Sequence, residues 1–252
     1  MTMPTYLSRG VQALFVVACG VAWYAATVHG AINPLLLPQF GRTMGDLWVL
    51  LRDGEFWPDL FVTMYELVVA FSMAALLGLI VGYFVGRARF TTRVCEPLFS
   101  TLYSVPTILL FPLFVLFFGI GPGSKIAMGA TIAFFPVVLT TIAGIGNTDA
   151  SLVKAARSMG ATNWQMFWLV MAPASLPVVI SGLRLGLILA LLAILGSETI
   201  ASLSGLGRQI VNFSDALETS KMFAYTLLVI AIATALNGLV TAAEGFVRRR
   251  VG

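Results

Sequence analysis

Few side chains in this sequence are placed where they could do chemistry, and Glu198 is the clearest of them. It lies inside a long apolar run, in the order Gly196-Ser197-Glu198-Thr199. An ionisable group in such a run is costly to expose to lipid and therefore faces protein, water or a solute. With Ser197 and Thr199 it forms a candidate wall of a translocation path or the external gate of that path. The alternative is a structural partner for a backbone group or a neighbouring helix.

Two hydroxyl side chains, Ser104 and Thr107, lie beside Pro106 in another apolar run. Proline within a membrane helix removes a backbone hydrogen bond, and neighbouring groups must compensate for the loss. Ser104 and Thr107 are therefore further candidates for lining the translocation path. A simple packing kink at Pro106 is the alternative interpretation.

The sequence holds no recognisable catalytic or cofactor-binding set. It has no Gly-x-x-x-x-Gly-Lys-Ser/Thr phosphate loop, no cluster of His, Cys and carboxylates at metal-binding spacing, and a single histidine. The net charge of +4 is spread between apolar runs, which disfavours nucleic-acid binding although the pI is near 9.3. We therefore expect no catalytic residue, metal or cofactor in this chain, and no nucleic-acid partner.

The longest polar interruption in the second half of the chain covers residues 149–177. Asp149 can accept a hydrogen bond from an otherwise unpaired N–H of a helix that we predict over 150–159. Gly160 can enter the left-handed region and end that helix. The interruption should therefore begin with one short, well-delimited helix.

A second short helix is predicted to follow the first. Thr162 and Gln165 have the spacing of a capping box, so this helix should start near residue 163. Pro173 and Pro177 would then lead the chain into the next apolar run. Small alanines on the first helix would allow another protein to approach this pair of helices closely.

The stretch KAARSMG, followed by nine residues and VMAP, resembles the EAA loop of bacterial ABC importer permeases. The family pattern is Glu-Ala-Ala, three residues, Gly, nine residues and Ile-x-Leu-Pro. Lys154, Val170 and Ala172 stand where the family has Glu, Ile and Leu, and the spacing is intact. The segments SVPTILLFPLFVLFFGIGPGSKIA and GSETIASLSGLG look like the nitrate, sulfonate and taurine branch of these importers.

The resemblance implies a role for this loop. In the family the EAA loop is the coupling helix that sits in a groove of the cytoplasmic ATPase subunit. The ATPase-coupling set implied here is Lys154, Ala155, Ala156, Arg157, Gly160, Ala161 and Pro173. A plain helical hairpin lying on the membrane surface is the alternative interpretation of the same residues.

Composition independently predicts an all-α integral membrane protein with one domain over residues 1–252, and the resemblance implies that this is a permease domain. Hydrophobic residues make up 59% of the chain and charged residues 10%, whereas soluble domains are about 45–50% apolar. The apolar runs predict six transmembrane helices, at about 11–28, 61–85, 98–118, 126–145, 178–202 and 222–246, with the coupling loop at 147–176. For the first run, a cleaved signal peptide is the alternative. A short amphipathic helix is expected over 43–52.

The positive charges predict the orientation in the membrane. Nine Lys and Arg residues fall on the side that we assign to the cytoplasm: Arg9, Arg87, Arg89, Arg93, Lys154, Arg157, Arg248, Arg249 and Arg250. Five fall on the other side: Arg42, Arg52, Lys125, Arg208 and Lys221. Both chain ends and the coupling loop should therefore be cytoplasmic.

Taken together, the resemblance implies a permease subunit of an ATP-driven importer with the type I ABC permease fold, in a bacterial inner membrane. The expected partners are a dimer of ABC ATPases that binds ATP and Mg, a second permease copy, and an external solute-binding protein. The expected solute is a small organic or inorganic anion of the sulfonate, taurine, nitrate or aromatic acid type. The alternatives are a thiamine precursor or other cyclic nutrient, an ATP-independent secondary transporter, and a membrane anchor that recruits an ATPase.

Overall fold

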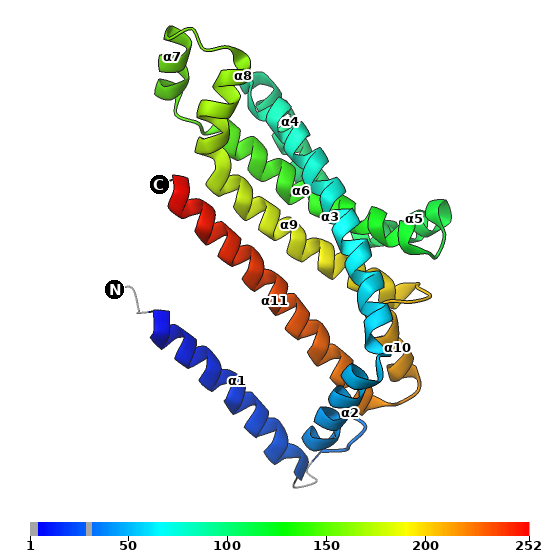
Figure 1. The fold of residues 1–252 in the computed structure, drawn as a ribbon. Helices are drawn as coiled ribbons and strands as arrows, with labels where there is room; N and C mark the ends of the chain where they lie inside the picture. The colour runs from blue at the N-terminus through cyan, green and yellow to red at the C-terminus, as the bar shows by residue number, and fades with distance from the viewer. Residues whose placement is uncertain (1–4, 29–31, 252) are drawn as a thin grey trace. The chain divides into compact units, whose positions relative to one another are not determined.

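The computed structural model describes residues 5–28 and 32–251, and every regular element in these ranges is helical (Figure 1). In chain order the elements are α1 (Thr5–Val28), α2 (Phe40–Asp53), α3 (Phe56–Gly86), α4 (Arg89–Tyr103), η1 (Thr107–Leu110), α5 (Phe111–Phe118), α6 (Pro122–Gly146), α7 (Ala150–Ser158), α8 (Asn163–Met166), η2 (Phe167–Met171), α9 (Ala172–Ile200), α10 (Leu206–Asp215) and α11 (Thr219–Val251). The chain ends, which we predict to be cytoplasmic, lie outside the described residues at 1–4 and 252.

Five helical stretches of the described chain are long and apolar enough to cross a membrane. They are Gly10–Val28, Phe56–Gly86, Pro122–Gly146, Asn163–Ile200 and Thr219–Ala242. A bent pair, Arg89–Tyr103 with Thr107–Phe118, makes a sixth if it is counted as one span. The all-helical membrane class predicted from composition is confirmed.

The third predicted span, 98–118, is not one straight helix. It breaks after Tyr103, and the two halves are bent by 75°. Pro106 has no N–H to donate and disfavours the helical conformation of the residue before it, so the α-helix ends ahead of it. Pro112 starts the next helix instead of breaking it, since it lies at the first positions of α5, where no intrahelical donor is needed.

The fifth span begins earlier than predicted, because Pro173 and Pro177 do not interrupt it. The helical run from Asn163 to Ile200 passes through the π turn η2, in which the Ala172 N–H donates to the carbonyl of Phe167. Pro173, which has no N–H to donate, directly follows this π turn at the first positions of α9, and the helical run continues through it. The second half of the coupling loop and the fifth span are therefore one continuous helical element.

The chain divides into two compact units, one made of residues 1–58 and 209–230 and the other of 59–208 and 231–252. In the first unit, Trp23 of α1 donates from Nε1 to the carbonyl of Pro38 at 2.9 Å and contacts the rings of Phe40 and Phe223. Phe56, 2% exposed, packs edge-on against Tyr225. Aromatic contacts thus join α1, α2 and the start of α11.

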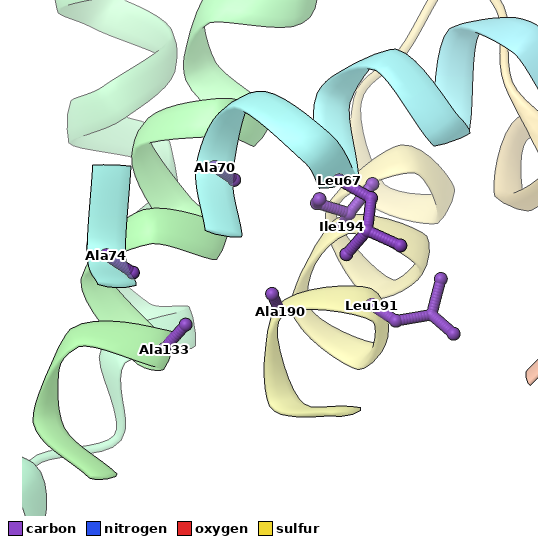
Figure 2. Close-up of a cluster of buried hydrophobic side chains, with 7 residues drawn as sticks. All are labelled: Leu67, Ala70, Ala74, Ala133, Ala190, Leu191 and Ile194. Atoms are coloured by element: carbon purple, nitrogen blue, oxygen red, sulfur yellow. The ribbon is translucent and has the colours of Figure 1, made fainter. Parts of the chain in front are cut away.

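In the second unit, α3, α6 and α9 pack around a core of small and aliphatic side chains (Figure 2). The core consists of Leu67, Ala70, Ala74, Ala133, Ala190, Leu191 and Ile194. In lipid there is little hydrophobic gain from helix association, and close contact of small residues provides it instead. Small residues of α3 therefore allow its close packing against α6 and α9.

Three glycines let α3 approach α6 closely. A Cβ added at Gly78 would come within 2.8 Å of Val137 Cγ1, one at Gly82 within 2.5 Å of Thr141 Cβ, and one at Gly86 within 2.9 Å of the Ile142 carbonyl oxygen. Real Cβ atoms do not come so close to other atoms, so any larger residue would push the helices apart.

Two amphipathic helices complete the chain. The structure confirms the one expected over 43–52, which is α2. The other, α10, begins within the Gly-rich segment 204–207 and was not predicted. Its short length and the absence of a capping hydroxyl pattern leave little trace in the sequence.

We predict that Gly82→Ala lowers stability by about 1–3 kcal/mol, because the added methyl group overlaps Thr141 in a packed interface. The measurement is thermal unfolding of the purified protein in detergent. Gly196→Ala is the matched control, because a Cβ there meets nothing within 4 Å in the interior of α9. Equal unfolding temperatures for both variants would contradict the close α3–α6 contact.

Candidate coupling surface and buried polar cluster

The coupling loop has the local structure that the sequence predicts. Asp149 Oδ1 accepts the Ser151 N–H at 2.8 Å at the start of α7, and this bond holds the pKa of Asp149 below its usual value. Gly160, with φ +76°, takes the left-handed conformation just past the helix end. The capping box at the start of α8 is present, with both Thr162 and Gln165 bonded.

The surface of α7 is open to a partner, because none of its residues is buried. Lys154, Ala155 and Arg157 are exposed, as is Gly160 in the turn. Ala156 and Ala161 are half-buried, and Pro173 is half-buried at the start of α9. Six of the seven predicted coupling residues therefore lie on α7 and its C-terminal turn, and Pro173 lies apart from them on another helix.

The residues predicted to line a path are not brought together by hydrogen bonds in the described chain. Ser104 donates to the carbonyl of Thr101 and Thr107 to that of Val105, both at the exposed bend between α4 and η1. On α9, Ser197 is buried and donates to the Ile194 carbonyl, while Thr199 is exposed and donates to the Gly196 carbonyl. Their role in a path stays a prediction.

Glu198, the fifth of these residues, is fully buried and has defined partners. Its Oε1 accepts from the Thr63 hydroxyl at 2.7 Å, and its Oε2 accepts from the Gly207 N–H at 2.7 Å. Thr63 in turn accepts the Leu206 N–H at 3.0 Å, and Asp59 accepts the Gly205 N–H at 2.8 Å. Side chains from α3 and α9 thus bind the free N–H groups at the start of α10.

Carboxylates suit this position because the start of a helix carries partial positive charge. Gly205 has φ +110°, and a Cβ there would overlap the Glu198 carboxylate. At Gly207 a Cβ would overlap the Leu195 carbonyl and the Glu198 side chain. The glycines of the SGLG segment are therefore required by the close approach of Glu198.

Two further ionisable residues in the second unit are almost fully buried. Glu66 is 1% exposed, and its Oε2 has no hydrogen-bond partner among the described residues. Lys125, also 1% exposed, donates from Nζ to the carbonyls of Ile120 and Gly121. We call Asp59, Thr63, Glu66, Lys125 and Glu198 the buried polar cluster.

Sequence reasoning found only Glu198 of this cluster as a site residue. Lys125 was assigned to the external side of the membrane, without a prediction of its burial; it folds back onto carbonyls at the end of the 119–121 turn and is buried. Glu66 carries the same sequence signal as Glu198, an ionisable group in an apolar run. Thr63 has no such signal, since single threonines are common in membrane helices.

Arg184, inside the fifth span, pairs with the last helix. Its Nε donates to Asn237 Oδ1 at 3.0 Å, and its Nη1 lies 3.5 Å from Glu244 Oε2. These polar contacts join α9 to α11 within the second unit. They also give the Arg184 cation hydrogen-bond partners that lipid tails could not provide. Among the described residues, no group of three or more His, Cys, Asp or Glu side chains could hold a metal ion.

Residues 74–251 match the family described as binding-protein-dependent transport system inner membrane component. The match includes α7, the turn at Gly160 and the helical run into α9, so it covers the whole coupling loop. The chain belongs to this family.

Individual relatives agree with the family match. The chain is 30% identical to the taurine transport system permease protein TauC of Escherichia coli over 222 residues, covering 86% of this chain and 80% of the relative. It is 33% identical to the putative aliphatic sulfonates transport permease protein SsuC of Bacillus subtilis over 202 residues, covering 80% of this chain and 73% of the relative. The chain is thus a permease subunit of an ABC importer, and ATP hydrolysis belongs to a separate subunit.

Solved structures show the same fold at lower sequence similarity. The MetNI methionine ABC transporter in an inward-facing conformation matches with a TM-score of 0.65 at 21% identity, covering 81% of this chain and 97% of that chain. An amino acid ABC transporter with histidines matches with a TM-score of 0.63 at 19% identity. The predicted ABC importer permease fold is confirmed.

The buried polar cluster generates a test of what Glu198 does. We predict that Glu198→Leu lowers stability by about 1–3 kcal/mol, because it leaves the buried Gly207 N–H without an acceptor. Glu198→Gln keeps an oxygen in place and should cost less. Thermal unfolding in detergent measures both, with Thr199→Val as the control at an exposed neighbour. A Leu variant as stable as the wild type would contradict the structural role.

Proposed function

We propose that this importer permease couples to its ATPase through α7 and its Gly160 turn. The observation that carries the proposal is that α7, capped at both ends, exposes its surface outside the membrane-spanning helices. A rigid short helix with small side chains offers a defined shape to a groove in a partner. Membership in the family implies an ATPase and a solute-binding protein as partners.

The continuity of the helix that follows supports a mechanical role for this loop. The run from Asn163 through the π turn into α9 has no break up to Ile200. Movement of an ATPase bound at α7 would enter this run through the short turn at residues 159–162, and the run would pass it to α9 and to the helices packed on α9. In this proposal ATP-driven closure of two ATPases tilts the spans between inward-open and outward-open states.

The solute path in this proposal runs between two permease copies, and the solute contacts the hydroxyls of the exposed Ser104 and Thr199 and of the half-buried Thr107. Glu198 and Ser197 support the wall of the path without contacting the solute, since both are buried and hydrogen-bonded within the protein. Identical copies would form the dimer. The excess of positive charge near α4 and α7 supports a cytoplasmic location for the coupling loop and both chain ends.

We infer that the solute is a small anion, and the named substrates of the relatives support this. They include taurine and aliphatic sulfonates, for permeases that cover most of this chain. A second candidate, a cyclic nutrient, is favoured by 29% identity over 214 residues to the riboflavin transport system permease protein RibX of Chloroflexus aurantiacus. A thiamine precursor belongs to the same class.

For the coupling surface, we predict that Ala155→Arg weakens ATPase binding at least about tenfold, or about 1.4 kcal/mol, because the long charged side chain fills the close approach. Ala155→Ser, which changes the volume little, should bind normally. Gly160→Ala should also weaken coupling, since αL costs a non-glycine residue about 1–2 kcal/mol. Co-purification with the ATPase and solute-stimulated ATP hydrolysis measure these effects. Normal binding and coupling by Ala155→Arg would overturn the proposal.

For the solute, we predict that taurine or an alkanesulfonate, delivered by the cognate binding protein, stimulates ATP hydrolysis of the reconstituted importer. Riboflavin and a thiamine precursor should not. Binding-protein-dependent uptake into proteoliposomes is the matching transport assay. If riboflavin or a thiamine precursor stimulated ATP hydrolysis and the sulfonates did not, the solute would be a cyclic nutrient and the proposed anion would be wrong.

A further inference from the structure

An apolar groove lies between the last turns of α3 and the start of the fifth span. It has a volume of about 800 Å³. It is lined by Leu76, Leu79, Ile80, Tyr83, Phe84, Asn163, Trp164, Phe167 and Trp168. We call it the aromatic groove. Leu76, Ile80 and Phe84 are 61%, 45% and 54% exposed, so the described residues leave this face of a membrane-spanning helix largely uncovered.

A second pocket, of about 420 Å³, opens beyond the end of the same helix. Five cations line it, and no carboxylate does: Arg87, Arg89, Arg93, Lys154 and Arg157. We call it the basic pocket. None of the five forms an ion pair with a described residue. The positive potential of these five side chains therefore favours binding of an anion that is not part of the described chain.

The aromatic groove and the basic pocket adjoin at the C-terminal turn of α3. Phe84 lines the groove, and Gly86 and Arg87 line the pocket. The Arg87 guanidinium lies over the Phe84 ring, 5.2 Å from its centroid. An apolar surface thus passes directly into a cationic one within a few residues.

The position of this boundary matches the edge of a bilayer. The groove lies along spans α3 and 163–200, at hydrocarbon or interfacial depth, and the pocket lies just past the end of α3. Trp164 and Trp168 are 70% and 52% exposed and stack edge-on at 5.5 Å. Exposed tryptophans are typical of the membrane–water interface.

We propose that the aromatic groove and the basic pocket together bind an anionic phospholipid. Its acyl chains would lie in the groove against Ile80 and Phe167, and its headgroup would bind Arg87, Arg89 and Arg93. Basic clusters at the end of a membrane helix attract anionic headgroups with about 1 kcal/mol for each cation. A second permease copy would cover the groove without neutralising the pocket, and an ATPase would reach the pocket but not a lipid-facing groove. One amphipathic anion satisfies both surfaces.

A lipid headgroup in the basic pocket would lie between the α3–α4 turn and α7. Lys154 and Arg157 of α7 line the pocket together with Arg87 and Arg89, which lie far from them in the sequence. A bound headgroup would screen the repulsion between the α3–α4 turn and α7 and hold the two segments together. Arg87, Arg89 and Arg93 lie outside the proposed ATPase-coupling set, so variants of these three residues test lipid binding separately from ATPase coupling.

The test uses quenching of tryptophan fluorescence by brominated acyl chains, with the full-length chain in lipid nanodiscs. Brominated phosphatidylglycerol is compared with brominated phosphatidylcholine, and a Trp164→Phe/Trp168→Phe variant assigns the quenched signal to the groove. We expect the apparent affinity of this site for phosphatidylglycerol to be at least about fivefold higher than for phosphatidylcholine. A factor of about five corresponds to the attraction of about one cation at the membrane surface. The preference should disappear in Arg87→Gln/Arg89→Gln/Arg93→Gln.

Arg42→Gln/Arg52→Gln on α2 is the matched control, because it removes exposed arginines that do not line the basic pocket. It should keep the preference. Equal quenching by both lipids, or a preference that survives the triple substitution, would overturn the headgroup site. If neither lipid quenches Trp164 or Trp168, the groove is covered by protein and the proposal is wrong. Gel filtration before reconstitution shows whether each variant is folded.

Discussion

The close backbone contact between α3 and α6 is the constraint on which the second unit depends. Gly78, Gly82 and Gly86 leave no room for a Cβ against α6, and alanines extend the same close packing to α9 (Figure 2). In lipid, where water does not drive helices together, such contacts are a main source of association energy. A polar site lies at each end of α3.

At one end of α3, the packing permits a set of buried hydrogen bonds. Asp59 and Thr63 reach the first N–H groups of α10, and Glu198 closes the set from α9. Because each of these three N–H groups is buried, losing one of these hydrogen bonds would cost folding free energy. The fold at this end is therefore determined by hydrogen bonding as well as by the packing of side chains. A membrane protein can thus hold an irregular segment near its core when side chains replace the missing backbone partners.

At the other end of α3, charge and helix continuity meet. The α3–α4 turn and α7 carry like charges that no described side chain neutralises, and the helical run from residue 163 to 200 connects the coupling loop to the core helix α9. A surface of this kind suits external partners, both a protein at α7 and an anionic headgroup beside it. Lys154 lies on α7 and lines the basic pocket, so it belongs to both proposed surfaces; the family pattern has Glu at this position.

The sequence by itself determined the membrane class, most of the helices and the local geometry of the coupling loop. Those features follow from apolar run length, from caps such as Asp149 and Thr162, and from Gly160, all of which act over a few residues. Sequence also marked Glu198 and Ser104 as polar groups in apolar runs, without their partners. Only the tertiary structure decided that Glu198 binds Thr63 and Gly207, that Lys125 is buried, and that the third span bends by 75°. These outcomes depend on which helices meet, and a hydrogen bond between residues 135 positions apart leaves no local pattern to find.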